Sequence, residues 1–328
     1  MLRRARDLVS ALRRRPRLLR SLEAITAAAV IGLCVYGVKG DWSRAGPQLA
    51  DARPDDVVLA LGTVAVYYLV FILGWMRILA AWDIRVPYRV ALQAEMASMI
   101  AKYVPGGVWT PAARVAALAR LTGETATGTV LASILLEAIL SAISGIVVFV
   151  VSLAWVHNVD APLAPLVLFA LTCLLILHPR VFGPAVTRVL RPFGLGPIAP
   201  LPFSTMATLL VFYSFTWIIG GLGLYFLIRS VGVAPSLATI PFLGGTAAIG
   251  AIVAVLAVFA PSGLGVREAS MYALLIAVTS NSAALGATIL NRLTITVVEL
   301  ALFLAGIAIW RLGRTSAPPD WDPDGLQT

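Results

Sequence analysis

Lys102-Tyr-Val-Pro-Gly-Gly-Val-Trp109 interrupts one long apolar segment of this sequence, and Phe259-Ala-Pro-Ser-Gly-Leu-Gly-Val266 interrupts another. A basic residue follows each break closely, at Arg114 and at Arg267. Proline lacks an N–H donor and glycine permits left-handed backbone, so both residue types tend to end helices. We therefore expect each segment to form two helices joined by irregular backbone.

The two breaks belong to a longer internal similarity. Pro105 and Pro261 lie 156 positions apart. The run Leu131-Ala-Ser-Ile-Leu-Leu-Glu137 recurs 155 positions later as Gly286-Ala-Thr-Ile-Leu-Asn-Arg292. Interrupted apolar segments at corresponding positions of two halves are typical of transporter binding sites. The pattern therefore indicates a membrane transporter.

Composition points to the lipid bilayer as the environment of this chain. Hydrophobic residues make up 59% of the sequence, charged residues make up 12%, and the mean hydropathy is +0.91. These values lie well outside those of soluble domains. Several apolar runs reach the roughly 20 residues that a spanning helix needs. We predict an all-α polytopic membrane protein without a soluble catalytic domain.

Other classes of chemistry have little support. Cys34 and Cys173 lie inside apolar runs, so we expect no disulfide. His157 and His178 lie far from any cluster of metal-ligand residues, so we expect no metal, and no nucleotide-binding motif indicates a cofactor. Residues 1–22 form a basic arm with eight arginines and one aspartate. Because an apolar run follows directly, we expect the arm to meet anionic lipid headgroups rather than nucleic acid.

The apolar runs predict six spanning helices and two broken or re-entrant hairpins. The spans are 23–38, 56–80, 126–155, 162–178, 203–228 and 283–310. The hairpins are 88–121 and 236–280. Together these segments form a transmembrane domain at 23–312, which a disordered cytoplasmic tail at 313–328 follows.

The basic residues predict the orientation. If each hairpin enters and leaves on one face, 17 basic residues fall on one side of the membrane and four on the other. Loops rich in basic residues stay in the cytoplasm, so we expect both termini to be cytoplasmic. The halves at about 56–155 and 203–310 then have opposite orientations, which makes them an inverted repeat.

Charged residues remain inside the apolar segments. Each costs a few kcal/mol or more at the bilayer centre unless it is paired or hydrated. Glu95 and Lys102 are seven positions apart, as are Arg292 and Glu299, so each pair should project from one face of a helix. These charges indicate either a polar cavity or a set of internal ion pairs that fix the packing of the helices.

The breaks suggest an anion site. The helices that restart after Gly107 and Gly265 would direct their N-termini towards the breaks, and helix N-termini attract phosphates and carboxylates. Arginine guanidiniums suit phosphate, and the carboxylates would neutralise the empty site or carry a coupling proton. The alternative is that the breaks are only packing kinks. The candidate binding residues are Lys102, Pro105, Gly106, Gly107, Arg114, Glu137, Pro261, Gly263, Gly265, Arg267, Glu268, Arg292 and Glu299.

These segments resemble the signature segments of the lysylphosphatidylglycerol synthetase transmembrane family, also called the flippase-like group. The resemblance rests on the first break with Arg114, on Pro261-Ser-Gly-Leu-Gly-Val-Arg-Glu268 and on Asn291-Arg-Leu293. It covers roughly residues 20–312. Family members often carry a Gly-Glu pair after the first Pro-Gly element, where this chain has Trp109-Thr110-Pro111.

The resemblance implies an integral protein of the bacterial or archaeal inner membrane. The family's membrane region is implicated in flipping aminoacylated phospholipid, and relatives accompany glycolipid and polyprenol-linked sugar pathways. The synthetase also carries a soluble aminoacyl-transfer domain after its membrane region. Because this sequence ends at Thr328 without one, we do not expect aminoacyl-lipid synthesis.

We expect a lipid translocase, not an enzyme, that moves an anionic phospholipid or a polyprenyl-phosphate-linked lipid. Two alternatives stay open at this point. One is a membrane-embedded enzyme acting on a lipid-linked substrate, with Glu137 or Glu268 as general base. The other is a non-catalytic partner of an envelope-biosynthesis enzyme.

Overall fold

The computed structural model of this chain is a bundle of helices within the unit Gln48–Thr328. The residues that the structure describes are 52–102, 109–123, 126–156, 159, 163–191, 199, 201–257, 263 and 265–315. The predicted basic arm, the predicted span 23–38 and the tail beyond Thr315 lie outside the described residues.

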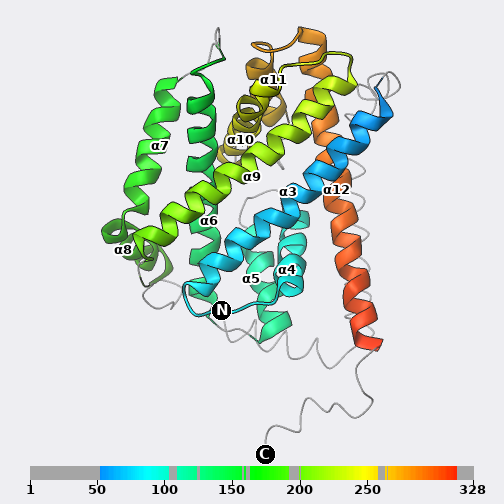
Figure 1. Ribbon diagram of the computed structural model, residues 1–328. Helices are drawn as coiled ribbons and strands as arrows, with labels where there is room; N and C mark the ends of the chain where they lie inside the picture. The colour runs from blue at the N-terminus through cyan, green and yellow to red at the C-terminus, as the bar shows by residue number, and fades with distance from the viewer. Residues whose placement is uncertain are drawn as a thin grey trace, which may run out of the picture. The chain divides into compact units, whose positions relative to one another are not determined.

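The described part of the chain is helical and contains no strand, which confirms the predicted all-α class. Figure 1 shows the arrangement of the helices. In chain order they are α3 (Pro54–Ala80), α4 (Tyr88–Ala101), α5 (Trp109–Thr122), α6 (Thr127–Ser152), α7 (Leu163–Leu177), α8 (Pro179–Leu190), α9 (Phe203–Ser230), the 3₁₀ turn η2 (Leu237–Thr239), α10 (Ile240–Leu256), α11 (Val266–Leu275) and α12 (Asn281–Thr315).

Five helical segments in the described residues are long and apolar enough to cross a membrane, namely α3, α6, α9, η2 with α10, and α12. The helices α3, α6, α9 and α12 are the spans predicted at 56–80, 126–155, 203–228 and 283–310. The predicted span 162–178 is α7, whose 15 residues reach only about 22 Å. It bends by 86° into α8, and the pair would count as a sixth span. The helix α8 was not predicted, because its arginines were assigned to a loop.

The outer face of α7 is apolar and exposed. Leu168, Leu171 and Leu175 are 66%, 58% and 65% exposed and share one side of the helix. Its other side contacts α6 and α8, and Cys173 lies in one buried cluster with Phe182 of α8. One face of α7 is therefore packed against protein, and the opposite face carries a stripe of exposed leucines. This arrangement suits a helix that contacts lipid.

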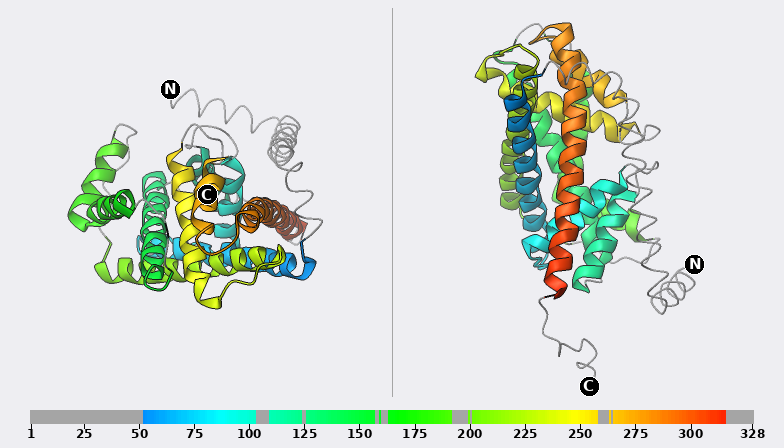
Figure 2. Two further views of the ribbon diagram at one scale, coloured as in Figure 1. Left: turned by 90° about the horizontal axis from the view of Figure 1, so that it is seen from above. Right: turned by 90° about the vertical axis from the view of Figure 1, so that its right-hand side faces the viewer.

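The long helices α3 and α9 form an antiparallel pair along one side of the bundle (Figure 2). At one end, the N–H of Arg53 donates to the carbonyl of Ser230 at 3.0 Å. At the other end, Nε1 of Trp82 donates to the carbonyl of Ala199 at 2.9 Å. The pair therefore provides a scaffold with two distinct ends, and each end receives one of the hairpins.

Both predicted hairpins are present, as α4–α5 and α10–α11, and they lie at opposite ends of the bundle (Figure 1, Figure 2). Their packing partners correspond. The helix α4 packs against α12 as α10 packs against α6, and α3 packs against α12 as α9 packs against α6. An inverted repeat requires this exchange of partners, and the repeat itself stays a prediction.

Glycines bring α9 and α10 into backbone contact. A Cβ atom at Gly221 of α9 would meet the carbonyl oxygen of Ile240 and the backbone nitrogen of Gly244. A Cβ atom at Gly244 would in turn meet the carbonyl oxygen of Trp217. Small residues allow this kind of approach between membrane helices, where packing rather than water drives association.

The replacement Gly244→Ala is expected to destabilise the protein by about 1–3 kcal/mol, because α9 and α10 would have to move apart. Gly62→Ala is the matched control, since a Cβ atom there meets no atom within 4 Å. Stability can be followed as the fraction of monodisperse protein that survives heating in detergent. Equal thermal stability of the two variants would contradict the close contact.

Candidate functional site

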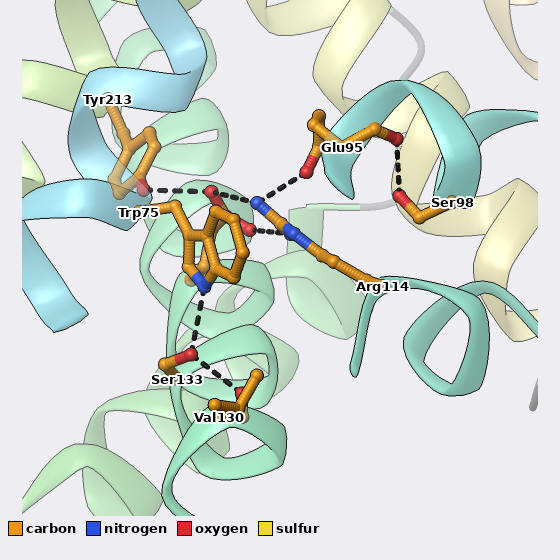
Figure 3. A network of polar contacts seen from close by, with 8 residues as sticks. Trp75, Glu95, Ser98, Arg114, Val130, Ser133 and Tyr213 are labelled. Atoms are coloured by element: carbon orange, nitrogen blue, oxygen red, sulfur yellow. Dashed lines mark hydrogen bonds and ion pairs between the residues drawn. The ribbon is translucent and has the colours of Figure 1, made fainter. Parts of the chain in front are cut away.

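Arg114 of α5 lies at the centre of a buried cluster of charges. Its Nη1 contacts Oε2 of Glu137 on α6, and its Nη2 contacts Oε2 of Glu95 on α4. A second bond to Glu137, from Nη2 to Oε1, measures 3.5 Å. Arg114 is 4% exposed and both glutamates are 3% exposed. Figure 3 shows the guanidinium pointing from α5 towards Glu95. This cluster joins both helices of the first hairpin to the following span.

Aromatic and hydroxyl groups from the surrounding spans complete the cluster. The guanidinium carbon of Arg114 lies 3.7 Å from the ring centroid of Trp75, a distance typical of a cation–π contact (Figure 3). The Trp75 indole N–H donates to Oγ of Ser133 at 2.8 Å. The Tyr213 hydroxyl donates to Oε1 of Glu137 at 3.3 Å. The spans α3, α6 and α9 therefore all hold the arginine in place.

A second ion pair joins the other hairpin to its following span. Nη1 of Arg292 on α12 donates to Oε1 of Glu268 on α11 at 3.2 Å. The other carboxylate oxygen of Glu268 accepts from the N–H of Gly265 at 2.7 Å, which caps the start of α11. Gly265 adopts a φ of 82°, a left-handed conformation that suits glycine. The N-terminus of α11 therefore already carries a carboxylate of its own chain.

The two hairpins are thus anchored in the same way, with the charges exchanged. Arg114 of α5 binds Glu137, which is 23 positions later on α6. Glu268 of α11 binds Arg292, which is 24 positions later on α12. The cation therefore lies on the hairpin in the first half and on the span in the second half.

A third ion pair connects the end of α4 to the spans. Nζ of Lys102 contacts Oε1 of Glu299 on α12. The hydroxyl of Tyr68 on α3 donates to the same oxygen at 2.5 Å. Glu299 is 2% exposed. This carboxylate is therefore neutralised and hydrogen-bonded where α3, α4 and α12 meet.

Arg267 differs from the other embedded basic residues. Among the described residues, its guanidinium has no hydrogen-bond or ion-pair partner, and its Nε is buried. The side chain packs against α10, where a Cβ atom at Gly250 would lie 3.4 Å from Cγ of Arg267. Tyr67, Tyr68 and Lys102 lie within electrostatic range of its charge. The half-buried guanidinium can therefore accept an anion from outside the described chain.

The structure describes most of the predicted site residues and shows which of them form pairs. It brings Arg114 to Glu137, Arg292 to Glu268 and Lys102 to Glu299. It describes Gly263 and Gly265, both with positive φ. The candidates Pro105, Gly106, Gly107 and Pro261 lie outside the described residues.

Sequence reasoning missed part of the cluster around Arg114. Glu95 was absent from the candidate binding residues, and its spacing of seven from Lys102 suggested that both project from one face. In the structure each of the two contacts a different helix, α5 for Glu95 and α12 for Lys102. Trp75, Tyr213 and Tyr68 lie within apolar spans. Nothing in the sequence around them indicates that their polar atoms contact the embedded charges.

The sequence matches the family described as "Lysylphosphatidylglycerol synthase TM region" over residues 22–302. The chain belongs to this lysylphosphatidylglycerol synthase transmembrane family. A search of the curated proteins found no match. Membership of the lysylphosphatidylglycerol synthase transmembrane family and the apolar helices together establish an integral membrane protein related to lipid metabolism or transport.

Arg114→Met is expected to destabilise the fold by about 3–5 kcal/mol, because it leaves the buried acidic groups Glu95 and Glu137 without their cation. Adding Glu95→Gln and Glu137→Gln should recover most of this loss, since the triple variant has no unpaired charge. Thermal stability in detergent measures both effects, and Arg77→Met, at an exposed arginine of α3, is the control. A triple variant as unstable as Arg114→Met would show that the cluster is not held by its charges.

Proposed function

We propose that this protein moves an anionic, phosphate-bearing lipid across the cytoplasmic membrane. The observation that carries the proposal is the Arg267 guanidinium, which is half-buried and has no partner among the described residues. An arginine in this position costs free energy unless an anion or water completes its hydrogen bonds. A lipid phosphate supplies both the charge and two oxygens that can accept parallel hydrogen bonds from the planar guanidinium.

The neighbouring charges support a site for one headgroup. Arg292 is already shared with Glu268, and Lys102 is shared with Glu299. Both cations therefore stay neutralised while no ligand is present, and both can contribute when an anion enters. Arg114 is engaged by two carboxylates, so its contribution in this conformation is to anchor the hairpin rather than to bind phosphate.

The path that we propose for the lipid uses two environments, the polar interior of the bundle and the surrounding bilayer. The headgroup would occupy the polar interior near Arg267, and the acyl or prenyl chain would stay among the exposed leucines and in the bilayer. Hairpins at opposite ends, each anchored by one ion pair, support alternating access by movement of one half against the other (Figure 1).

Arg267→Ala is expected to lower the transbilayer movement of lipid by at least about tenfold, because one charge-assisted contact to phosphate is worth roughly 1.5–3 kcal/mol. The assay uses purified protein in liposomes with fluorescent phosphatidylglycerol or fluorescent polyprenyl phosphate, and an impermeant quencher reports the outer leaflet. The matched control is Arg77→Ala, at an exposed arginine near the end of α3.

Wild-type rates in both Arg267→Ala and Arg292→Ala would contradict this site. Formation of a modified lipid by the wild type in detergent, where no two sides exist, would favour a membrane-embedded enzyme instead. Retained cellular function after neutralisation of all four embedded basic residues, in a folded protein, would favour a non-catalytic partner of envelope-biosynthesis enzymes.

We also propose that the end of the bundle carrying Arg85 faces the cytoplasm, as do both termini. Arg85 follows α3 and Ser236 precedes α10, so they lie at opposite ends, and both are exposed. In a variant without Cys34 and Cys173, a cysteine replacing Ser236 should react with an impermeant maleimide on intact cells. A cysteine replacing Arg85 should react only after permeabilisation, and the reverse pattern would invert the topology.

A further inference from the structure

The embedded charges of the described residues balance as a whole but not locally. Arg114 faces two carboxylates, so the cluster with Glu95 and Glu137 carries an excess negative charge when all three groups are ionised. Lys102 and Glu299 cancel each other. All three members of the Arg114 cluster are at most 4% exposed, so water does not compensate the excess. A buried, uncompensated carboxylate is strongly unfavourable.

The hydrogen bonds show which carboxylate is less well compensated. Glu137 accepts from both terminal nitrogens of Arg114, at 3.5 Å for the longer bond, and from the hydroxyl of Tyr213. Glu95 has a single contact with the guanidinium, between its Oε2 and Nη2 of Arg114. Glu137 is therefore the better compensated carboxylate, and Glu95 is the group whose negative charge has less support.

No other cation is available to Glu95 among the described residues that face it. The helix α3 contributes Trp75, whose ring already lies against Arg114. The span α6 contributes Glu137 and α9 contributes Tyr213, which adds no positive charge. The span α12 contributes Glu299, whose charge is taken up by Lys102 at the end of α4. The surroundings therefore favour the neutral form of Glu95.

We propose that Glu95 is a proton-binding site, and that exchange of this proton adjusts how firmly the hairpin α4–α5 is held. Protonation places one hydrogen on a carboxylate oxygen and brings the cluster with Arg114 and Glu137 to zero charge. The remaining oxygen of the acid can still accept from Arg114. Deprotonation returns the proton to water and creates a second carboxylate that attracts the Arg114 guanidinium in competition with Glu137. Glu95 therefore links protonation to the position of the hairpin.

A proton fits this site better than a metal cation. Metal cations such as Ca²⁺ and Mg²⁺ need about six oxygen ligands around them. The Arg114 guanidinium contacts both carboxylates and would repel a cation in that place. The described residues contain no group of three or more side chains that could hold a metal ion.

The coupling role rests on the proposed function, because a proton can drive transport only if the protein transports. Under that proposal, the first half binds the proton at Glu95, while the second half binds the anionic headgroup at Arg267. The exchange of charges between the halves would then make one half selective for a proton and the other selective for an anion.

Infrared spectroscopy tests the proton directly and does not depend on transport. The C=O stretching band of a protonated carboxylic acid should be present in the purified wild type at neutral pH and absent in Glu95→Gln. Glu299→Gln is the matched control and should retain the band, because Glu299 has its own cation, Lys102, and a hydrogen bond from Tyr68. Absence of the band from the wild type, or its loss in Glu299→Gln but not in Glu95→Gln, would overturn the proposal.

Stability supplies a second readout. Glutamine resembles the protonated acid in shape and charge, so Glu95→Gln should fold and should match or exceed the thermal stability of the wild type. If Glu95 were instead an ionised partner of Arg114, its neutralisation would destabilise the protein. A Glu95→Gln variant that is unstable or fails to fold therefore also overturns the proposal.

Liposomes separate this proposal from the proposed function. With labelled phosphatidylglycerol, a pH gradient should accelerate transbilayer movement several-fold in the wild type and leave Glu95→Gln unchanged. An equal response of both proteins would overturn the coupling role of Glu95. If the wild type moves no lipid under any gradient, the transport proposal fails, and the infrared band alone decides whether Glu95 binds a proton.

Discussion

An ionised side chain inside a bilayer must find an opposite charge, because lipid offers neither water nor counterions. This constraint accounts for the positions of the short helices. The helices α4, α5 and α11 contain 14, 14 and 10 residues, so each is too short to span the membrane. Each is instead tied to a span by a charge, through Lys102 to α12, through Arg114 to α6, and through Glu268 to α12.

The same pairs create the polar interior on which the proposed function depends. The first hairpin is divided between α4 and α5 and the second between α10 and α11, and polar backbone groups at such breaks are tolerated only inside protein or beside water. Six of the eight embedded charges form three pairs that close the described bundle, and Glu95 is a second acidic partner of Arg114. Arg267 remains as the cation that packing does not use, which is why it carries the assignment of the anion site.

In each half an ion pair joins the hairpin to the span that follows it, and the signs of the two charges are exchanged between the halves. Arg114 on the first hairpin and Glu268 on the second occupy similar places relative to the span that follows. The first half consequently holds an excess of carboxylate at Glu95, and the second half holds an excess of guanidinium at Arg267. Under the two proposals, the halves would bind ligands of opposite charge with corresponding arrangements of helices.

The sequence by itself determined the bilayer as solvent, four of the long spans, both hairpins and the identity of every embedded charge. These features depend on local properties: the length of an apolar run, the helix-breaking effect of proline with glycine, and the residue type at one position.

Only the tertiary structure decided which charges meet. Lys102 and Glu299 are 197 positions apart, and Tyr213 reaches Glu137 across 76 positions. Partners at such distances depend on how helices pack, and spacing along one helix cannot encode that packing. Glu95 was left out of the candidate site for this reason, and α8 was missed because its arginines were assigned to a loop.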